Sequence, residues 1–515
     1  MTNYSRDSIR DTLLQLSSNE KTERMKVKYD YYFYNGAAED MEEAKIDRLK
    51  LGQNWDSKDN LDYEVEQDIR NKIKPLLKKQ ARFMFSKKPN ITFIGADYRN
   101  KKQLEELRIW IDDLLSKTKF WKKSKEAFLN ASIKKRVMLR LIAREGYINF
   151  KYEDILNCNY DITDETLIEA RFFEEDKANA IKNNDTEKIY YIHKFSYKNI
   201  EGEEETLTRP FYTKLTYKSS DLISEEEIML DVNSIPCWLI TNGGELGEEY
   251  GETDLHDLKP MQKKYNSIVT DVDEAIKFGL FGIETVIDGD KDMVNEFTVC
   301  AGAIHATKTD AQALTTGKQA SIERQEFSLS NISSVDIHLQ RLENDMYNVL
   351  DMPKISDLTN IPSAKAMKYL YNDLIARCEE KWSDWGSIFE DVIRYIISIA
   401  DHYKLTGFKK EWENLDFSID FTHNYPIPSD EEDRKTIAIE EVLANVRTRK
   451  SYIQEFSTED DYEKEFKEII RENSLLSGSE IGEFETVQET SSTDETSSKN
   501  KQDKEDEKEL DKDEE

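Results

Sequence analysis

The sequence predicts an α+β protein, and three observations support this prediction. Apolar residues recur at helical spacing through much of the first third of the chain. Between Gly146 and Trp238 the pattern changes to extended segments with alternating, aromatic-rich side chains, such as GYINFKY, KIYYIHKFSY and RPFYTKLTY. Two amphipathic helical segments then enclose an irregular insert. We therefore expect helices first, antiparallel strands joined by acidic turns next, and helices again.

In the first third, the pattern predicts four elements before the strand-rich region. They are a helix over 7–36 that ends at Gly36, a helical run over 62–85, a short strand over 88–95 and helical structure over 100–143. The basic run within 122–140 is open to two interpretations, an interaction patch or the solvated face of an amphipathic helix.

The glycine-rich stretch NGGELGEEYGETD, residues 242–254, is predicted to be a flexible acidic linker and a boundary. A helix over 257–278 follows, with Asp257 in position to cap it and Pro260 tolerated in its first turn. One apolar stripe runs along this helix: Leu258, Met261, Tyr265, Ile268, Val272 and Ile276.

After that helix, residues 280–330 are irregular, with the strand-like pieces GIETVIDG, EFTVCAGAIHA and ASIERQEFSL. A second helix over 333–350, capped by Ser333, carries its own apolar stripe: Val335, Leu339, Leu342, Met346 and Val349. The two helices therefore flank an inserted unit.

The last third begins with a proline-bounded segment and a long helix over about 363–404, with Gly386 as the expected kink. A strand over 414–428 follows. Ser429 and Glu432 form an S-x-x-E capping box. Three helices are expected after it, over 429–444, 448–456 and 458–474, and then a disordered acidic tail beyond Leu475.

The charge balance narrows the possible functions. The formal net charge is −32 over 515 residues, which argues against a protein that grips nucleic acid with a basic face. It does not argue against a protein that handles DNA without gripping it.

The termini and cysteines indicate a cytoplasmic place of synthesis. Four scattered cysteines form no CxxC pair, so we expect reduced thiols and neither disulfides nor a zinc site. The polar N-terminus predicts no signal peptide, and no run approaches the ~18 apolar residues of a membrane helix.

Motifs for catalysis or cofactor binding are not found. The segment TTGKQ, 315–319, lacks the first glycine and the hydroxyl of a P-loop, and DGDKD, 288–292, has the wrong spacing for a calcium loop. The six histidines are isolated, and no GxSxG elbow occurs. We expect no enzyme activity, cofactor or metal.

Three segments, in this order and spacing, carry a resemblance that covers nearly the whole chain. They are RFMFSKKPNITF (82–93), MPKISDLTNIPSAKAMKYL in the middle and NYPIPSDEEDRKTIAIEEV near the end. With this layout the chain resembles the portal proteins of tailed double-stranded DNA bacteriophages, most of all those of long-tailed phages of Gram-positive hosts. The sequence has Ser363-Ala364 where the family commonly has Ser-Gly, so a glycine hinge is not expected there.

The resemblance implies a division of the chain into parts. These are an N-terminal wing region (1–252), a first stem helix (253–279), a clip (280–330), a second stem helix (331–350), a tunnel loop (351–362), a long kinked helix with the return strand of the wing (363–428), a helical crown (429–475) and a disordered acidic tail (476–515).

The resemblance also implies a function and a set of partners. The expected assembly is a homo-oligomeric ring, usually of twelve subunits, at one capsid vertex, through which double-stranded DNA passes during packaging and ejection. The expected partners are the terminase large subunit, the head–tail adaptor, and the major capsid and scaffolding proteins. No membrane contact is expected. The protein would be assembled in the host cytoplasm and remain in the virion.

Two groups of residues are candidates for this role. The tunnel-loop candidates are Lys354, Ser356, Asp357, Thr359, Asn360, Ser363 and Lys365. The candidates for a stem interface between subunits are Leu258, Met261, Ile268, Val272, Ile276, Leu339, Leu342 and Met346. For Lys354 and Lys365 two interpretations stay open: transient contacts with phosphates, or solvation of helix ends.

Two other functions remain as alternatives. A scaffolding or adaptor protein would also serve head assembly, but scaffolding chains are usually shorter and mostly helical. A DNA-processing enzyme such as a nuclease requires a cluster of carboxylates or histidines, and the sequence shows none.

Overall fold

The structure is a computed structural model, and it divides the chain into two units, Met1–Pro428 and Ser429–Glu515, each described here by itself. The residues that it describes are 6–36, 68–95, 98–176, 188–201, 206–244, 247–281, 283–290, 292, 307–325, 332–354, 364–423, 425–427, 431–456 and 462–477. Helices and strands are both abundant, which confirms the α+β class.

The N-terminal helical region is two helices, α1 (Arg6–Leu13) and α2 (Ser18–Asn35), where one was predicted. Ser17 causes the interruption, because its side-chain oxygen caps α2 by accepting the Glu20 N–H at 3.1 Å. Gly36 ends α2 as predicted. Its φ of 73° is the left-handed conformation that glycine adopts without cost, and its N–H donates to the Tyr32 carbonyl.

Two helical predictions in the first third extend too far. Helix α4 (Ile73–Met84) begins later than the predicted 62–85, and residues 68–72 are not helical. Helices α5 (Lys101–Lys117) and α6 (Phe120–Lys134) are followed by strand β2 (Arg136–Arg144), so the helical prediction was wrong over 136–143. The first six residues of β2 are buried, so the strand lacks the alternation of buried and exposed residues that would separate it from a buried helix.

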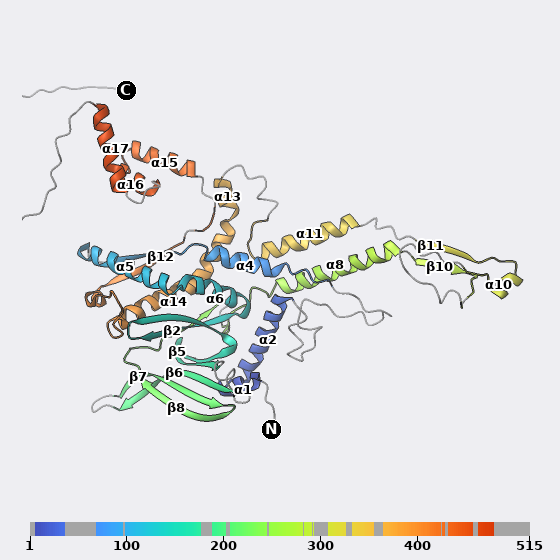
Figure 1. Cartoon of the computed structure of the whole chain (residues 1–515), viewed down its shortest axis with the longest axis horizontal. Helices are drawn as coiled ribbons and strands as arrows, with labels where there is room; N and C mark the ends of the chain where they lie inside the picture. Colours follow the sequence, from blue (N-terminus) through green and yellow to red (C-terminus); the bar gives the residue numbers. More distant parts are fainter. Residues whose placement is uncertain are drawn as a thin grey trace, which may run out of the picture. The chain divides into compact units, whose positions relative to one another are not determined.

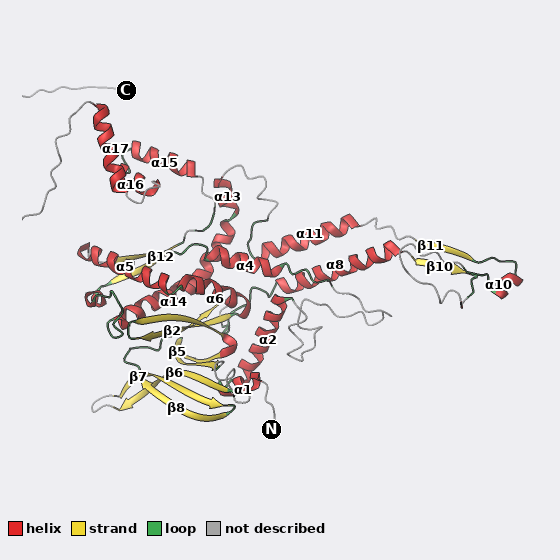
Figure 2. Cartoon of the chain, in the orientation of Figure 1, coloured by secondary structure: helices red, strands yellow, loops and turns green. Residues whose placement is uncertain are grey.

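Two antiparallel sheets make up the strand-rich region, as predicted (Figure 2). The three-stranded sheet has the order β3-β2-β9 and the five-stranded sheet the order β4-β5-β6-β7-β8. The strands besides β2 are β3 (Tyr147–Asp154), β4 (Cys158–Thr163), β5 (Thr166–Glu175), β6 (Ile189–Glu201), β7 (Thr206–Lys218), β8 (Asp221–Met229) and β9 (Cys237–Thr241).

The largest hydrophobic core forms around helix α14 (Asn372–Ala400), where Trp385 and Phe389 are fully buried. The predicted long helix is broken, but at Tyr371, between α13 (Ala364–Leu370) and α14. It continues through Gly386 as one helical segment, and the kink expected there stays a prediction. A Cβ at Gly386 would lie 2.7 Å from Trp382 Nε1, so this glycine makes room for an indole ring.

Strand β1 (Asn90–Gly95) pairs antiparallel with β12 (Phe417–Thr422), which confirms both predicted strands and joins the start of the chain to its last third. The rings of Phe93 and Phe417 lie 4.7 Å apart between their centroids. Short 3-10 helices occupy Tyr98–Asn100, Ile155–Asn157 and Lys410–Asn414.

Helices α8 (Leu258–Phe281) and α11 (Ile332–Val349) lie side by side, and the chain between them forms a small unit (Figure 1). In that unit β10 (Ile283–Ile287) pairs antiparallel with β11 (Ser321–Gln325), and a short helix, α10 (Ala311–Thr315), lies between them in sequence. Both helices and two of the three strand pieces are thus confirmed. The third piece, 296–306, lies outside the described residues.

The second unit contains α15 (Glu431–Leu443), α16 (Arg449–Phe456) and α17 (Tyr462–Ser477), close to the three predicted helices. The predicted tail over 476–515 starts two residues too early, because α17 extends to Ser477, and Ser429 and residues 478–515 lie outside the described residues. Among the described parts of the chain, no helix has the length and apolar character needed to cross a membrane.

Candidate functional site: the α8–α11 helix pair and its junction with α14

The eight residues predicted for a contact between subunits fall into two groups. Leu258 and Met346 have no exposed surface within this chain. The other six are half-buried: Met261, Ile268, Val272, Ile276, Leu339 and Leu342. A side chain buried in its own chain offers nothing to a neighbour, so a contact with another copy would rest on the half-buried group.

A second face of α8 is polar and buried, which the sequence analysis missed. Gln262, Asn266 and Thr270 are fully buried and follow one another at every fourth position. Their side-chain oxygens accept backbone N–H groups of a segment far away in sequence: Gln262 from Lys72 at 2.9 Å, Asn266 from Arg70 at 3.2 Å and Thr270 from Asp68 at 2.9 Å. We call residues 68–72 the strap.

The two spacings match, and this explains why the strap lies along α8. Four residues of helix rise about 6 Å, and two residues of extended chain span about 6.6 Å. Every second strap residue therefore meets the next polar side chain. Gln262 adds two bonds of its own, donating to the Arg70 carbonyl and to Asn266 Oδ1, both at 2.9 Å. The sequence signal was the polar i, i+4, i+8 series beside the apolar stripe.

At the start of α8, the buried carboxylate of Asp254 receives three donors. Its Oδ1 lies 2.8 Å from Lys381 Nζ, 3.1 Å from Asn242 Nδ2 and 3.5 Å from Arg377 Nη2. Burial by itself raises the pKa of Asp254, but the charges of Lys381 and Arg377 outweigh burial and hold this pKa below its usual value. The carboxylate is therefore ionised and joins the chain before α8 to helix α14.

The segment 242–254 was predicted to be a flexible linker, and this prediction was wrong because the segment is anchored at both ends. Asn242 and Thr253 are buried, and the Asn242 N–H donates to the Lys135 carbonyl at 2.7 Å. Gly251 has a φ of 71°, and a Cβ there would lie 2.9 Å from the Lys135 carbonyl oxygen. Only glycine fits this close approach.

Arg377 connects the same junction to the end of α11. Its Nη1 lies 3.3 Å from the Val349 carbonyl oxygen and 3.4 Å from Asp351 Oδ2. Met352 and Pro353, which follow, are buried. The beginning of α8 and the end of α11 are therefore held by two cations on successive turns of α14, Arg377 and Lys381.

The predicted tunnel-loop residues lie mostly beyond what the structure describes. Lys354 is half-buried at the last described position after α11. Lys365 lies in α13, but its side chain is not among those described. Ser356, Asp357, Thr359, Asn360 and Ser363 lie outside the described residues.

Both interpretations of the basic run within 122–140 were wrong for its last part, which is buried and ion-paired. Arg136 is fully buried and donates to both carboxylate oxygens of Glu20 on α2, at 3.0 and 2.9 Å. Lys134 pairs with Asp154, and Arg140 donates to Glu153 at 2.8 Å. A one-dimensional pattern does not show that the acids of α2 and β3 cover these cations.

Over the described ranges, no group of three or more histidine, cysteine or acidic side chains is arranged to hold a metal ion. The three cysteines described, Cys158, Cys237 and Cys378, are buried free thiols, and burial raises the pKa of each. The arrangement described above is one of anchoring rather than of catalysis.

Comparison with models of protein families gives a match over most of the chain. A sequence model of the family described as "Phage portal protein, SPP1 Gp6-like" matches residues 14–475. The match includes the strap, the helix pair, the junction and all three helices of the second unit. A search among curated proteins found no match. Because the family match covers most of the 515 residues, the chain belongs to the SPP1 Gp6-like family of phage portal proteins.

Proposed function

We propose that this portal protein assembles into a ring at one capsid vertex and that double-stranded DNA passes through the ring. The observation that supports assembly most directly is the apolar surface left on the α8–α11 pair. Ile332 and Ile337 on α11 are 38% and 51% exposed, and four apolar residues of α8 (Met261, Ile268, Val272 and Ile276) are only half-buried. A neighbouring pair in a ring would remove this surface from water, as closed symmetric assemblies do.

In this proposal each part of the chain has a place in the ring. Helices α8 and α11 form the stem, and β10, β11 and α10 belong to the clip, which binds the terminase large subunit and later the head–tail adaptor. Residues 351–362 form the tunnel loop. The sheets with α14 form the wing and α15 to α17 the crown, which would face the major capsid and scaffolding proteins.

The charge of the chain supports a DNA conduit. A duplex carries about one negative charge per ~1.7 Å of its axis. A ring of subunits with a net charge of −32 each repels such a cargo instead of binding it, and a channel that moves DNA needs low friction. Portal proteins are structural, so we propose no catalytic step for this chain.

The ring is tested by placing a charge on the exposed face of α11. We expect the unmodified chain to have a mass of several hundred kilodaltons by light scattering, twelve times 60.4 kDa for a dodecamer. Ile337→Asp should shift the population to monomers, because twelve buried carboxylates would face apolar neighbours. Ile109→Asp on α5, where the isoleucine is 55% exposed, is the matched control and should leave the ring intact.

A wild-type chain that stays monomeric or dimeric at every salt concentration would contradict the proposal. If Ile337→Asp has the same mass as a wild-type ring, the ring is supported, but the interface between subunits does not include this face of α11.

The tunnel loop requires a separate experiment. We propose that Lys354 and Lys365 contact passing phosphates transiently. Replacing both with Glu should lower the amount of DNA packaged per head while leaving the ring mass unchanged. If packaging is unchanged, the two lysines only solvate helix ends. The phage would be a long-tailed one of a Gram-positive host, assembled in the host cytoplasm, and detection of the protein in purified virions of such a phage would support this placement.

A further inference from the structure

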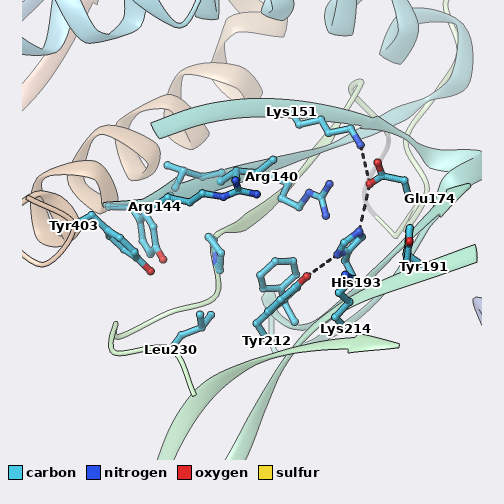
Figure 3. Close-up of a pocket in the computed structure, with 16 residues that line it drawn as sticks. Arg140, Arg144, Lys151, Glu174, Tyr191, His193, Tyr212, Lys214, Leu230 and Tyr403 are labelled. Carbon is cyan, nitrogen blue, oxygen red and sulfur yellow. Dashed lines mark hydrogen bonds and ion pairs between the residues drawn. The ribbon is translucent and has the colours of Figure 1, made fainter. Parts of the chain in front are cut away.

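A cavity of about 680 Å³ lies between the three-stranded and the five-stranded sheet, beside the end of α14. Strands β2 and β3 form one wall, and β5, β6 and β7 form the opposite wall (Figure 3). Tyr395 and Tyr403 close one side. This volume lies within the range of about 300–1,000 Å³ that is typical of small-molecule sites.

The cavity is positively charged although the protein as a whole is strongly negative. Four of the sixteen residues that line it are cations: Arg140, Arg144, Lys151 and Lys214. Glu174 is the one carboxylate among those sixteen. It lies 3.6 Å from Lys151 Nζ and 3.3 Å from His193 Nε2. One carboxylate does not neutralise four cations.

Three of the four cations lie opposite another basic residue across neighbouring strands, and two of these, Arg140 and Lys151, place like charges opposite each other. Arg140 lies opposite Lys151 in the β2–β3 ladder, and His193 lies opposite Lys214 in the β6–β7 ladder. Like charges opposite one another destabilise a sheet. Outside the cavity lining, Glu153 offsets the first pair by accepting from Arg140 at 2.8 Å and from Lys151 at 2.9 Å. Lys214 lies over the Tyr191 ring and has Glu226 opposite it in the β7–β8 ladder.

One donor in the cavity wall is buried and has no partner. The Arg140 side chain is 6% exposed, and its Nε makes no hydrogen bond with any described residue. A buried donor that makes no bond costs about 1–3 kcal/mol. Figure 3 shows Arg140 pointing from the upper sheet toward His193 and Tyr212 on the lower one.

The remaining lining is aromatic and apolar. Tyr212 stacks on His193 with a ring-plane angle of 13°, and its hydroxyl lies 2.7 Å from His193 Nδ1. Phe195, Leu230 and Pro236 complete that side. A ligand that fits such walls has a flat apolar body as well as negative charge.

We propose that this cavity binds a small organic anion with an aromatic body, of the class of nucleoside phosphates, with Arg140, Arg144 and Lys214 facing its charged groups. Guanidinium groups favour phosphate oxygens, and tyrosine and histidine rings favour a planar base. This inference concerns the sheets and does not depend on the ring.

The test uses calorimetric titration of the full-length chain with dATP in the absence of divalent ions. Binding is expected, and Arg144→Gln and Lys214→Gln should each weaken it roughly tenfold or more, because each removes a charged partner of the phosphate groups. Lys410→Gln removes an exposed cation from another part of the unit and should not change the affinity. Arg140 is left intact because its loss would also remove one of the two cations that pair with Glu153.

A second readout distinguishes this site from charge attraction elsewhere. Burial first, and then the neighbouring cations, lower the pKa of His193 to about 4. An anion in the cavity offsets the charge of these cations and therefore raises the pKa of His193. Binding of dATP at pH 5.5 should then be accompanied by uptake of a fraction of a proton, and His193→Gln should abolish that uptake.

Three results would overturn the inference. They are no heat of binding up to millimolar dATP, wild-type affinity for dATP in both Arg144→Gln and Lys214→Gln, and binding of an oligoglutamate peptide where dATP does not bind. The last would assign the cavity to an acidic chain segment instead of a small molecule.

Discussion

Asp254 shows how a single buried carboxylate holds several segments together. It lies just before α8, and its partners are two cations of α14 and the amide of Asn242 at the end of β9. The same Arg377 also reaches the end of α11. Removing the charge would leave two buried cations facing a neutral group, which is costlier than the loss of one hydrogen bond.

We therefore predict that Asp254→Asn lowers the free energy of unfolding by about 3–5 kcal/mol, the range for breaking a buried ion pair. Urea denaturation followed by circular dichroism measures it. Asp401→Asn removes an exposed carboxylate that pairs with Lys410 at 2.9 Å, and should cost less than about 1 kcal/mol. If the two variants lose similar amounts of unfolding free energy, the buried ion pairs of Asp254 stabilise the fold no more than an exposed pair does.

A second residue-scale prediction concerns acid stability. The pKa of His193 is lowered from its ordinary value of 6.5 to about 4 in the folded chain. Between these values the unfolded chain binds more protons, so the contribution of His193 to stability is complete above pH 6.5 and falls as the pH drops toward 4. His193→Gln should narrow the difference in unfolding free energy between pH 7.5 and pH 5 by about 1–2 kcal/mol. If the variant and the wild type show the same difference, the imidazole is accessible to protons in the folded state.

At the scale of elements, the strap and α8 form a contact between a backbone and a row of side chains. Replacing Gln262 and Asn266 together with Ala would leave the Lys72 and Arg70 N–H groups without protein acceptors. The strap is partly exposed, so water replaces some of these bonds. We predict a loss of about 1–3 kcal/mol in unfolding free energy and faster hydrogen exchange at both amides.

The control for this variant is Lys264→Ala, an exposed position on the same helix. It should change stability by less than about 0.5 kcal/mol and leave exchange in the strap unchanged. Unchanged exchange at residues 70 and 72 in the double variant would mean that the strap is held by other contacts.

Helices and strands were predictable from the sequence where one of their faces is exposed to water, and less so where both faces are buried. The stripes on α8 and α11, the cap at Gly36 and the antiparallel strands all follow from local pattern. Strand β2 was taken for a helix because its residues are buried on both faces. The strap was taken for a helix because its contacts with α8 are about 190 residues away in sequence, which no local window includes.

At the scale of the whole molecule, the two units should be separable. We predict that a chain ending at Pro428 keeps the thermal transition of the first unit, because the contacts cluster on either side of that residue. A chain ending at Leu415 removes β12, including Phe417 and Ile419, and leaves β1 unpaired. Its Tm should fall by roughly 10 °C or more, since losing two buried apolar side chains costs several kcal/mol. Equal melting of both truncated chains would show that β12 is dispensable.

The candidate site was predictable only in outline. The order of segments indicated the portal family, and the family match confirms it. The apolar residues of the helix pair also followed from periodicity. The junction at Asp254 did not, because acidic residues next to glycines are usually solvated, and only the fold shows that Lys381 and Arg377 enclose this one.

The strap has a consequence for how the sequence can change over time. Its three contacts use the main chain of residues 68, 70 and 72, so the side chains there take no part in them. Mutations at these positions leave the hydrogen bonds in place, with the exception of proline, which has no N–H to donate. The constraint falls instead on Gln262, Asn266 and Thr270. Related portal proteins should therefore vary more at strap positions 68, 70 and 72 than at these three positions of the helix, which need acceptor side chains.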